Sequence, residues 1–295
     1  MEEAKYHSNG IIKRLYITFE AFLKQGEINH VTGDISFINF LFKKKRSILT
    51  ILDCGFMMNP SAWKREVLRI FWLAIPVKRA QIVTVISQAT KDEVLKLVKC
   101  NPDKIRVVPV FISEAFTPGA TMEFNGNKPV LLQIGTKANK NIERLFEAVK
   151  GLPCKLDLVG ELTPDHVKML SDFEIEYENS VRISNEEIME KYRNCDIVTF
   201  VSTYEGFGMP IIEANSFNKP VVTSNLLSMP EVAADAACLV NPYDIKQIRE
   251  GITRIIKDAT YRNELVENGK KNRLRYLPDE ISNMYLDIYK EILEK

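Results

Sequence analysis

The clearest chemical pattern in the sequence is a pair of carboxylates, Glu205 and Glu213, that frame a loop containing Gly206 and Gly208. A carboxylate can accept two hydrogen bonds from a vicinal diol. We therefore expect Glu213 to hold a ribose and Glu205 to contact a sugar hydroxyl. In the alternative interpretation, one glutamate caps a helix and the other is solvated, and a lone Gly-x-Gly pattern is compatible with it.

This loop follows a predicted strand and precedes a predicted helix. The apolar run 197–201 indicates a strand buried on both faces, and Pro210 is typical of a first helical turn, where its missing N–H is no loss. The glycines let the backbone approach a ligand closely, and a helix N-terminus offers free N–H groups and a positive dipole end. The pattern predicts an anion site, suited to phosphate, at the carboxyl end of a parallel sheet.

The elements that must position this loop are visible as short apolar runs rich in valine and isoleucine. These runs cover residues 48–52, 82–86, 105–109, 130–134, 156–159, 197–201 and 220–223. Continuous apolar runs of this length suit the strands of parallel sheets. Helical patterns lie between them, for example after Ser87, after Asn185, and from a capping box of Asp244 and Gln247 through Lys257. The alternation predicts the α/β class, with two Rossmann-like doubly wound domains.

The predicted domain boundary falls between Ser113 and Lys128, where Pro118-Gly119 and Asn125-Gly126-Asn127 interrupt any apolar periodicity. We expect an N-terminal domain over 1–118, a second domain over 126–278, and a C-terminal amphipathic helix over 279–295. Before the boundary only about four strands are visible, including a short one at 28–32 that follows a helix at 11–24. The first domain is therefore expected to be abbreviated.

Composition excludes several classes of function. Lys plus Arg number 40 against 39 Asp plus Glu, so no global field would recruit nucleic acid. Five scattered cysteines without a C-x-x-C pair indicate reduced thiols in the cytoplasm, and three separated histidines predict no zinc site. The N-terminus is charged, and no apolar stretch approaches the roughly 18 residues of a membrane span. We expect a cytoplasmic protein, peripheral at the inner membrane face at most.

Several motifs taken together resemble the retaining, nucleotide-sugar-dependent glycosyltransferases of the GT-B fold, the glycosyltransferase group 1 (family 4) class. The resemblance covers nearly the whole chain and is strongest from about Val130 to Pro242. The segments that carry it are the E-x7-E motif from Glu205 to Glu213 with Gly206-Phe207-Gly208, the segment from Met229 to Pro242, Gly135 to Asn141, Ser87, and Lys104 to Pro109. In this fold the last helix commonly returns to the first domain.

The resemblance implies roles for individual residues. Glu205 would contact the donor sugar near the reacting carbon, and Lys140 would neutralise the departing diphosphate, a charge that forms during the reaction. The alternative for Lys140 is an ordinary solvated lysine, and Lys137 would be a second basic contact. The positions implied for binding the nucleotide sugar are Gly135, Thr136, Lys137, Lys140, Ile183, Gly206, Phe207, Gly208, Met209, Pro210 and Glu213.

The resemblance also implies how the reaction would proceed. Transfer would pass through an oxocarbenium-like state with retention of configuration, and the diphosphate oxygen would help to take the acceptor proton. The segment around Ile183 would contact the base through its backbone. No metal or other cofactor is expected, because lysine and helix termini replace the ion and because Asp34, Asp53 and Asp196 are isolated.

Two features depart from the family pattern. Full members usually open with a strand and a glycine-rich loop, which Gly10 and Gly26 do not form. Where the family often carries a histidine, in a T-I-H-D pattern, this chain has Leu52, which can neither bond a sugar hydroxyl nor shuttle a proton. These features support an alternative function: a nucleotide-sugar-binding pseudoenzyme, or a subunit whose missing loop comes from a partner chain or oligomer.

A basic and aromatic segment allows two interpretations. Residues 61–80 hold Trp63 and Trp72 among five Lys and Arg residues, and Lys43 to Arg46 form a basic run upstream. Such a helix can lie at an anionic membrane surface, which would suit a lipid-linked acceptor. The alternative is a buried helix with a solvated charged face. Arg69 and Pro76 are expected to break its apolar stretch.

We therefore expect an enzyme that moves a sugar from a nucleotide-diphosphate donor to a glycan or lipid-linked acceptor, in polysaccharide biosynthesis. An NAD-linked Rossmann enzyme is disfavoured, because no early G-x-G-x-x-G follows a first strand.

Overall fold

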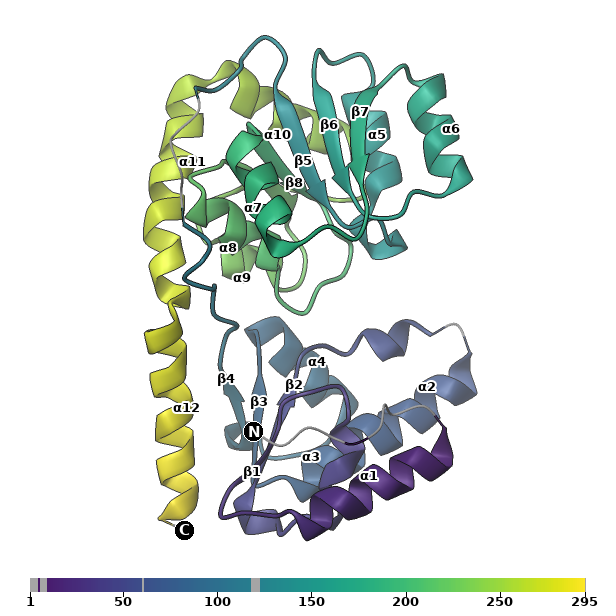
Figure 1. Ribbon diagram of the computed structural model, residues 1–295, viewed down its shortest axis with the longest axis vertical. Coiled ribbons are helices and arrows are strands. Elements are labelled where there is room, and N and C mark those ends of the chain that lie inside the picture. The colour runs from purple at the N-terminus through teal and green to yellow at the C-terminus, as the bar shows by residue number, and fades with distance from the viewer. Residues whose placement is uncertain (1–4, 6–9, 60, 118–122, 295) are drawn as a thin grey trace. The chain divides into compact units, whose positions relative to one another are not determined.

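The computed structural model describes residue 5 and residues 10–59, 61–117 and 123–294. The chain forms two compact units: unit 1 comprises Met1–Val110 with Asp279–Lys295, and unit 2 comprises Phe111–Pro278. Each unit contains one parallel sheet with helices (Figure 1), so the predicted α/β class is confirmed. The predicted linker residues Pro118 and Gly119 lie outside the described residues.

The division between the units follows Val110, whereas the sequence places the end of the first domain at 118. Contacts within unit 2 give the reason. The Ile112 N–H donates to the Tyr276 carbonyl at 2.8 Å, and the Phe116 ring packs edge-on against Tyr192 with centroids 6.4 Å apart. The segment that looks like a linker in the sequence is therefore held to unit 2.

Among the described residues of unit 1, four parallel strands lie in the order β1-β2-β3-β4. The strands are β1 (Asn29–Val31), β2 (Ser47–Ile51), β3 (Ile82–Val85) and β4 (Ile105–Val107). The helical segments are α1 (Ile11–Leu23), η1 (Ser36–Leu41), η2 (Lys44–Arg46), η3 (Gly55–Met58), α2 (Ala62–Leu68), η4 (Arg69–Ala74), α3 (Ile75–Arg79), α4 (Gln88–Leu97), η5 (Pro102–Lys104) and α12 (Pro278–Leu293). Each strand agrees with a predicted apolar run within two residues at either end.

Both faces of this sheet are covered, as the continuous apolar runs require. Adjacent residues of β2 point to opposite faces: Ile48 packs in a cluster with Ile288 of α12, and Leu49 packs in another with Val77 of α3. The helix α12 therefore forms one layer over the unit 1 sheet and has the packing role expected of the C-terminal segment.

The helical segment from Ala62 to Arg79 is continuous, and Arg69 and Pro76 interrupt only its run of apolar residues, as expected. The stretch η4 is a π-helix directly before Pro76, and Pro76 lies in the first turn of α3. The wider π turn accommodates a residue that lacks an N–H donor and would clash in a regular turn. Within the described parts of the chain, no helix is long and apolar enough to cross a bilayer.

The part of unit 2 that the structure describes contains six parallel strands in the order β10-β9-β8-β5-β6-β7. The strands are β5 (Val130–Ile134), β6 (Lys155–Val159), β7 (Glu176–Ser180), β8 (Ile197–Phe200), β9 (Val221–Ser224) and β10 (Cys238–Val240). The helices are α5 (Ile142–Val149), α6 (Pro164–Asp172), α7 (Asn185–Asn194), α8 (Met209–Ser216), α9 (Met229–Ala233), α10 (Ile245–Lys257) and α11 (Ala259–Asn272). Sequence patterning predicts β5, β6, β8 and β9 but not the two edge strands.

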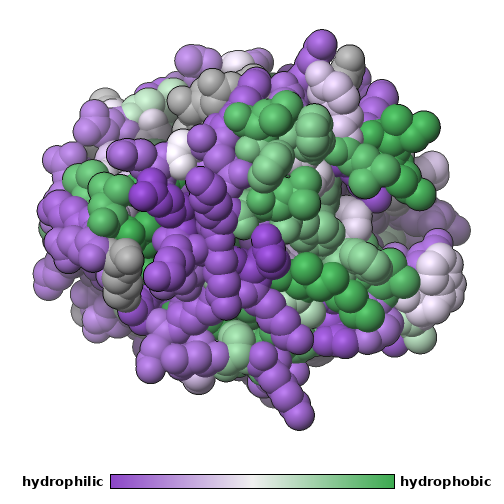
Figure 2. Space-filling model, turned by 90° about the horizontal axis from the view of Figure 1, so that it is seen from below, coloured by the Kyte–Doolittle hydropathy of each residue, from purple (hydrophilic) through white to green (hydrophobic). Residues whose placement is uncertain are grey.

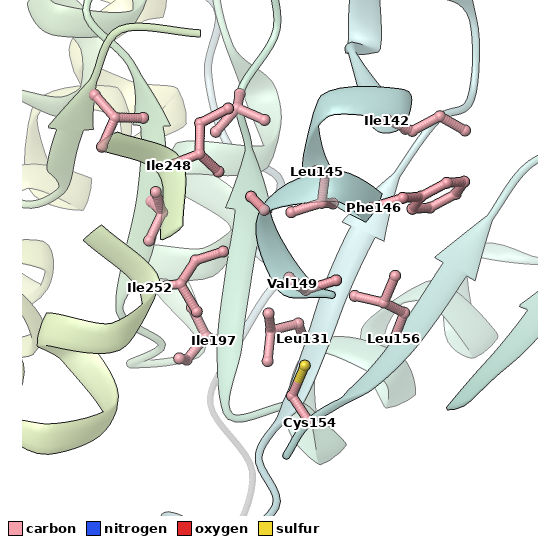
Figure 3. Close-up of a cluster of buried hydrophobic side chains, with 14 of the residues drawn as sticks. Leu131, Ile142, Leu145, Phe146, Val149, Cys154, Leu156, Ile197, Ile248 and Ile252 are labelled. Carbon is pink, nitrogen blue, oxygen red and sulfur yellow. The ribbon is translucent and has the colours of Figure 1, made fainter. Parts of the chain in front are cut away.

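A large apolar cluster of unit 2 fixes these elements in place. Leu145 and Phe146 of α5 and Ile252 of α10 pack onto Leu131 of β5 and Ile197 of β8 (Figure 3). All five side chains are fully buried. The central strands that carry the loops of interest are thus held rigidly from one face.

The residues that cap the N-termini of α7 and α10 agree only partly with the prediction. The cap of α7 is Ser184 rather than Asn185, and it forms a reciprocal capping box with Glu187. Asp244 caps α10 as expected, since its side chain accepts from the Gln247 N–H. The reciprocal half of the predicted capping box does not form, because the Asp244 N–H donates to the Asn241 carbonyl at 3.1 Å and the Gln247 side-chain amide donates to the Asp244 carboxylate.

Candidate functional site

The strand order of unit 2 reverses between β5 and β8, which are adjacent and in register from Leu131↔Ile197 onward. In a parallel sheet the crevice at the carboxyl ends of such strands is where ligands bind. The loops after β5 and β8 are joined there by hydrogen bonds: the Thr203 N–H donates to the Asn139 carbonyl at 2.8 Å, and the Asn139 amide donates to the Tyr204 carbonyl at 3.0 Å. Both sequence-predicted loops therefore meet at this position.

The predicted catalytic residues are in direct contact. Lys140 Nζ lies 2.7 Å from Glu205 Oε1, and the two side chains are only 19% and 16% exposed. The Asn139 amide donates to the same carboxylate oxygen at 3.2 Å, and Lys140 Nζ lies 4.8 Å from the centroid of the Phe200 ring. The interpretation of Lys140 as a solvated surface lysine is therefore wrong: it is an ion-paired group at the reversal point.

Gly135, directly after β5, leaves room for this lysine. Its φ is +88°, a conformation that L side chains rarely adopt, and an added Cβ would lie 3.0 Å from Lys140 Cε. Its N–H donates to the Val159 carbonyl at 2.7 Å, which holds the turn against β6. Gly135 therefore permits the Lys140 side chain to cross the end of the strand.

The glycine loop after β8 leads into α8, as predicted, with Pro210 buried in the first turn. Of the two glycines only Gly208 has a positive φ, +127°, and an added Cβ would lie 3.0 Å from Ile211 Cδ1. Phe207 is buried and packs edge-on against Tyr276, so its side chain is directed into the core, whereas Met209 is half-buried. The loop thus contributes backbone groups at the start of an eight-residue helix.

Ser228 and Ser202 are two residues at this loop that sequence reasoning missed. The buried Ser228 hydroxyl donates to the Phe207 carbonyl at 2.6 Å, and the Glu205 carbonyl is 3.0 Å from the same oxygen. The Ser202 hydroxyl, directly after β8, is buried without a hydrogen-bond partner among the described residues. Serine is common in loops, so its type carries no signal that could have identified either residue.

Glu213, in α8, forms a second buried acidic position. Its carboxylate accepts a hydrogen bond from the Tyr192 hydroxyl at 2.6 Å. Burial raises the pKa of Glu213, while the Tyr192 hydrogen bond and the charge of Lys140 oppose that rise. Burial likewise raises the pKa of Tyr192 well above its ordinary value. Glu213 lies in the helix that begins directly after the glycine loop.

The remaining predicted positions lie around the carboxyl ends of the strands in unit 2. Thr136 donates through its hydroxyl to the Glu161 carbonyl at 2.6 Å. The Lys137 side chain is exposed, and its carbonyl accepts from the Lys140 N–H at 2.7 Å, so the structure gives Lys137 a backbone role. Ile183 is half-buried in the loop between β7 and α7, next to Arg182, which has a positive φ of 57°.

Asn141 also has a structural role at this position. It is buried, in the left-handed conformation, and its amide donates to the Val201 carbonyl at 3.1 Å and to the Pro242 carbonyl at 2.7 Å. One side chain therefore ties the loop after β5 to the end of β8 and to the loop after β10. No cluster of acidic, histidine or cysteine residues that could hold a metal ion occurs in the described parts of the chain.

Comparison with protein families gives a match to the model described as glycosyl transferases group 1, over residues 120–272. The chain is 24% identical to the O-antigen chain mannosyltransferase B of Escherichia coli, and the match covers 83% of this chain and 70% of that protein. It is 25% identical to the N,N'-diacetylbacillosaminyl-diphospho-undecaprenol alpha-1,3-N-acetylgalactosaminyltransferase of Campylobacter jejuni, with 57% of this chain and 46% of that protein covered.

Among solved structures, Alr3699/HepE of Anabaena, in complex with UDP and glucose, superposes with a TM-score of 0.80 and 16% identity. The superposition covers 95% of this chain and 82% of the Anabaena chain. At this identity the likeness shows the fold alone, and that fold is the predicted GT-B class.

Proposed function

The chain belongs to the glycosyl transferases group 1 family, and from this premise we propose that unit 2 binds a nucleotide-diphosphate sugar whose glycosyl group is transferred with retention of configuration. The observation that carries the proposal is the ion pair of Lys140 and Glu205 where the strand order of unit 2 reverses, beside the start of α8, the helix that holds Glu213. A cation, a carboxylate and a helix N-terminus at one sheet edge suit a sugar diphosphate.

In the proposed mechanism Lys140 acts on the leaving group. Its ammonium, held in a site largely closed to water, would stabilise the charge that develops on the diphosphate as the glycosidic bond breaks. The positive end of α8, which begins after Gly208, would add to this stabilisation. The acceptor hydroxyl would attack the oxocarbenium-like sugar from the same face, and a diphosphate oxygen would take its proton.

Glu205 and Glu213 would orient the donor. The Glu205 carboxylate, positioned by Lys140 and Asn139, would accept a hydrogen bond from a hydroxyl of the sugar. Glu213, fixed by Tyr192, would accept from the ribose diol in its ionised form. The residues around Ile183 would contact the base. No metal ion enters this proposal, because Lys140 and the start of α8 supply the positive charge.

The acceptor is proposed to be a glycan or a lipid-linked sugar. The names of two relatives support this: one is an O-antigen chain mannosyltransferase, and the other is named for a diphospho-undecaprenol-linked substrate. The first reactions to test are therefore the transfer of mannose and the transfer of an N-acetylated hexosamine.

The experiment begins with thermal shift measurements against UDP, GDP and ADP sugars, followed by hydrolysis and transfer assays with the donor that binds. We expect one nucleotide class to stabilise unit 2, and Glu213→Gln to weaken that binding by about 1–3 kcal/mol. Lys270→Ala, on the exposed end of α11, is the control. Absence of binding for every donor would reject the proposed function.

A second candidate, a nucleotide-sugar-binding subunit without transfer activity, is favoured by one observation. Leu52, directly after β2, is 44% exposed where the family often has histidine, so no imidazole is available there to shuttle a proton. Donor binding without hydrolysis or transfer to any acceptor would identify this function instead.

A further inference from the structure

The helix α1 presents its apolar side chains outward. Ile17 is 1% exposed and faces the core of unit 1. The apolar residues on the other side of the helix are between 42% and 84% exposed; we call them the α1 face, and they are Ile11, Ile12, Leu15, Phe19, Phe22 and Leu23. An ordinary surface helix has the opposite arrangement, with its apolar side buried. An exposed apolar patch of this kind indicates an interaction surface.

Figure 2 views the molecule from the side on which α1 lies in Figure 1. It shows a continuous apolar area bordered by hydrophilic side chains. Along a helix of 13 residues, the α1 face returns every three to four positions, at residues 11 and 12, then 15, 19, and 22 and 23, so its members form a single stripe.

A basic run lies beside the C-terminal end of this stripe. Lys43, the first residue of the exposed Lys43 to Arg46 run, donates its N–H to the Gln25 side chain at 2.8 Å. The Gln25 amide in turn donates to the Phe22 carbonyl at 2.9 Å, within the α1 face. These two bonds place the basic run of η2 next to Phe22 and Leu23.

The charge of this region differs from that of the rest of the chain. Residues 10–46 contain seven Lys and Arg against three Asp and Glu, a surplus of four positive charges. The remaining residues contain 33 Lys and Arg against 36 Asp and Glu, a deficit of three. The one acidic residue of α1, Glu20, is paired with Lys24 at 3.1 Å, so it does not offset the basic run. Positive charge is therefore concentrated around the exposed apolar stripe.

We propose that the α1 face docks on an anionic lipid bilayer, with its apolar side chains in the interfacial region and the η2 basic run against the lipid headgroups. Interfacial helices combine these two features: an apolar stripe that enters the headgroup boundary and lysines that attract anionic lipid. A second copy of the chain fits less well, because a two-fold interface through this face would bring two basic runs together. This contact uses α1 rather than the 61–80 segment.

The proposal does not depend on the chemistry proposed for unit 2, and its test uses no sugar. Binding of the full chain to phosphatidylcholine vesicles with and without phosphatidylglycerol is measured by co-sedimentation, at low and high salt. We expect binding to the anionic vesicles that weakens at high salt. Changing Leu15→Gln and Phe19→Gln together should lower the vesicle affinity about 10- to 100-fold. Lys44→Glu with Lys45→Glu should lower it by about tenfold or more.

The matched controls lie in unit 2. Val167→Gln removes a similarly exposed apolar side chain from α6, and Lys270→Glu with Lys271→Glu reverses two exposed charges at the end of α11. Both controls should bind vesicles like the parent chain. Thermal unfolding of each variant shows whether it is folded, and if the double glutamine variant does not fold, Phe22→Gln alone provides the same test.

Three outcomes would overturn the proposal: no binding to anionic vesicles, equal binding by the α1 and control variants, or equal binding to vesicles with and without phosphatidylglycerol. A dimer in solution that Phe19→Gln dissociates, without vesicle binding, would show that a second copy covers the α1 face.

Discussion

Replacing Lys140 by alanine separates the structural role of the buried ion pair from its proposed catalytic role. The 2.7 Å contact with Glu205 joins two side chains that are each less than one-fifth exposed. Breaking a fully buried pair costs about 3–5 kcal/mol, and an exposed pair contributes about 0–1 kcal/mol. Because the Glu205 carboxylate keeps the Asn139 amide and some solvent, we expect Lys140→Ala to lower the free energy of unfolding by about 2 kcal/mol.

The effect on turnover should be much larger. Losing a group that stabilises charge on the leaving diphosphate typically lowers kcat about 10²- to 10³-fold. Urea denaturation measures the stability change, and donor hydrolysis or transfer at saturating donor measures kcat. Combining Lys140→Ala with Glu205→Gln should cost less stability than the sum of the single changes, because Glu205→Gln removes the carboxylate charge that Lys140→Ala leaves unpaired.

A matched control is available in the same unit. Lys191 of α7 pairs with Asp157 of β6 at 2.6 Å, with side chains 16% and 10% exposed, away from the carboxyl ends of the strands. Lys191→Ala should therefore cost a similar amount of stability and leave kcat unchanged. If both variants keep the parent kcat, or if Lys140→Ala lowers kcat no more than Lys191→Ala does, Lys140 is a structural residue and the catalytic assignment is refuted.

Four further predictions concern the other residues of the site. Burial raises the pKa of Glu213, and the Tyr192 hydrogen bond opposes that rise. In Tyr192→Phe the carboxylate should therefore become protonated, and nucleotide affinity should fall, at a higher pH than in the parent chain. An unchanged pH profile of binding by calorimetry would contradict this. The raised pKa of Glu213 stabilises the fold at low pH, and this contribution is lost as the pH rises through that pKa. Glu213→Gln should therefore become more stable than the parent chain as the pH increases, which urea denaturation measures. Gly135→Ala should lower kcat at least tenfold, because its Cβ would displace Lys140, and wild-type turnover would show that the lysine moves freely. Ser228→Ala should reduce the free energy of unfolding by about 1–2 kcal/mol in the same denaturation assay.

The fold was predictable where burial is symmetric. β5 and β8 are central strands with both faces covered, so each is apolar except for one buried polar residue, Gln133 in β5 and Thr199 in β8. β7 is an edge strand whose sequence, Glu-Tyr-Glu-Asn-Ser, is largely polar because half-exposed residues do not need to be apolar. β10 is the other edge strand, a short one with its middle residue Leu239 exposed, and it gives no continuous buried run.

The candidate site was predictable as a set of reactive groups but not as a set of contacts. Glu205, Glu213 and the glycine loop are recognisable because their types and spacing are unusual. The partners that fix them are ordinary: Tyr192 resembles any core aromatic on an amphipathic helix, and Asn139 resembles any loop asparagine. Such contacts between distant parts of the chain follow from strand order, which the sequence does not display directly.

The placement of α12 over the unit 1 sheet sets an order for folding during synthesis. The ribosome must make all of 111–278, the 168 residues of unit 2, after β4 and before the helix that covers Ile48 and Ile82. At about 5–20 residues per second this delay lasts roughly 10–30 s. During that interval the unit 1 sheet exposes one bare apolar face, whereas unit 2 can complete its own core as soon as it emerges. The unit made first is thus the unit finished last, and chaperone protection during translation matters most for its sheet.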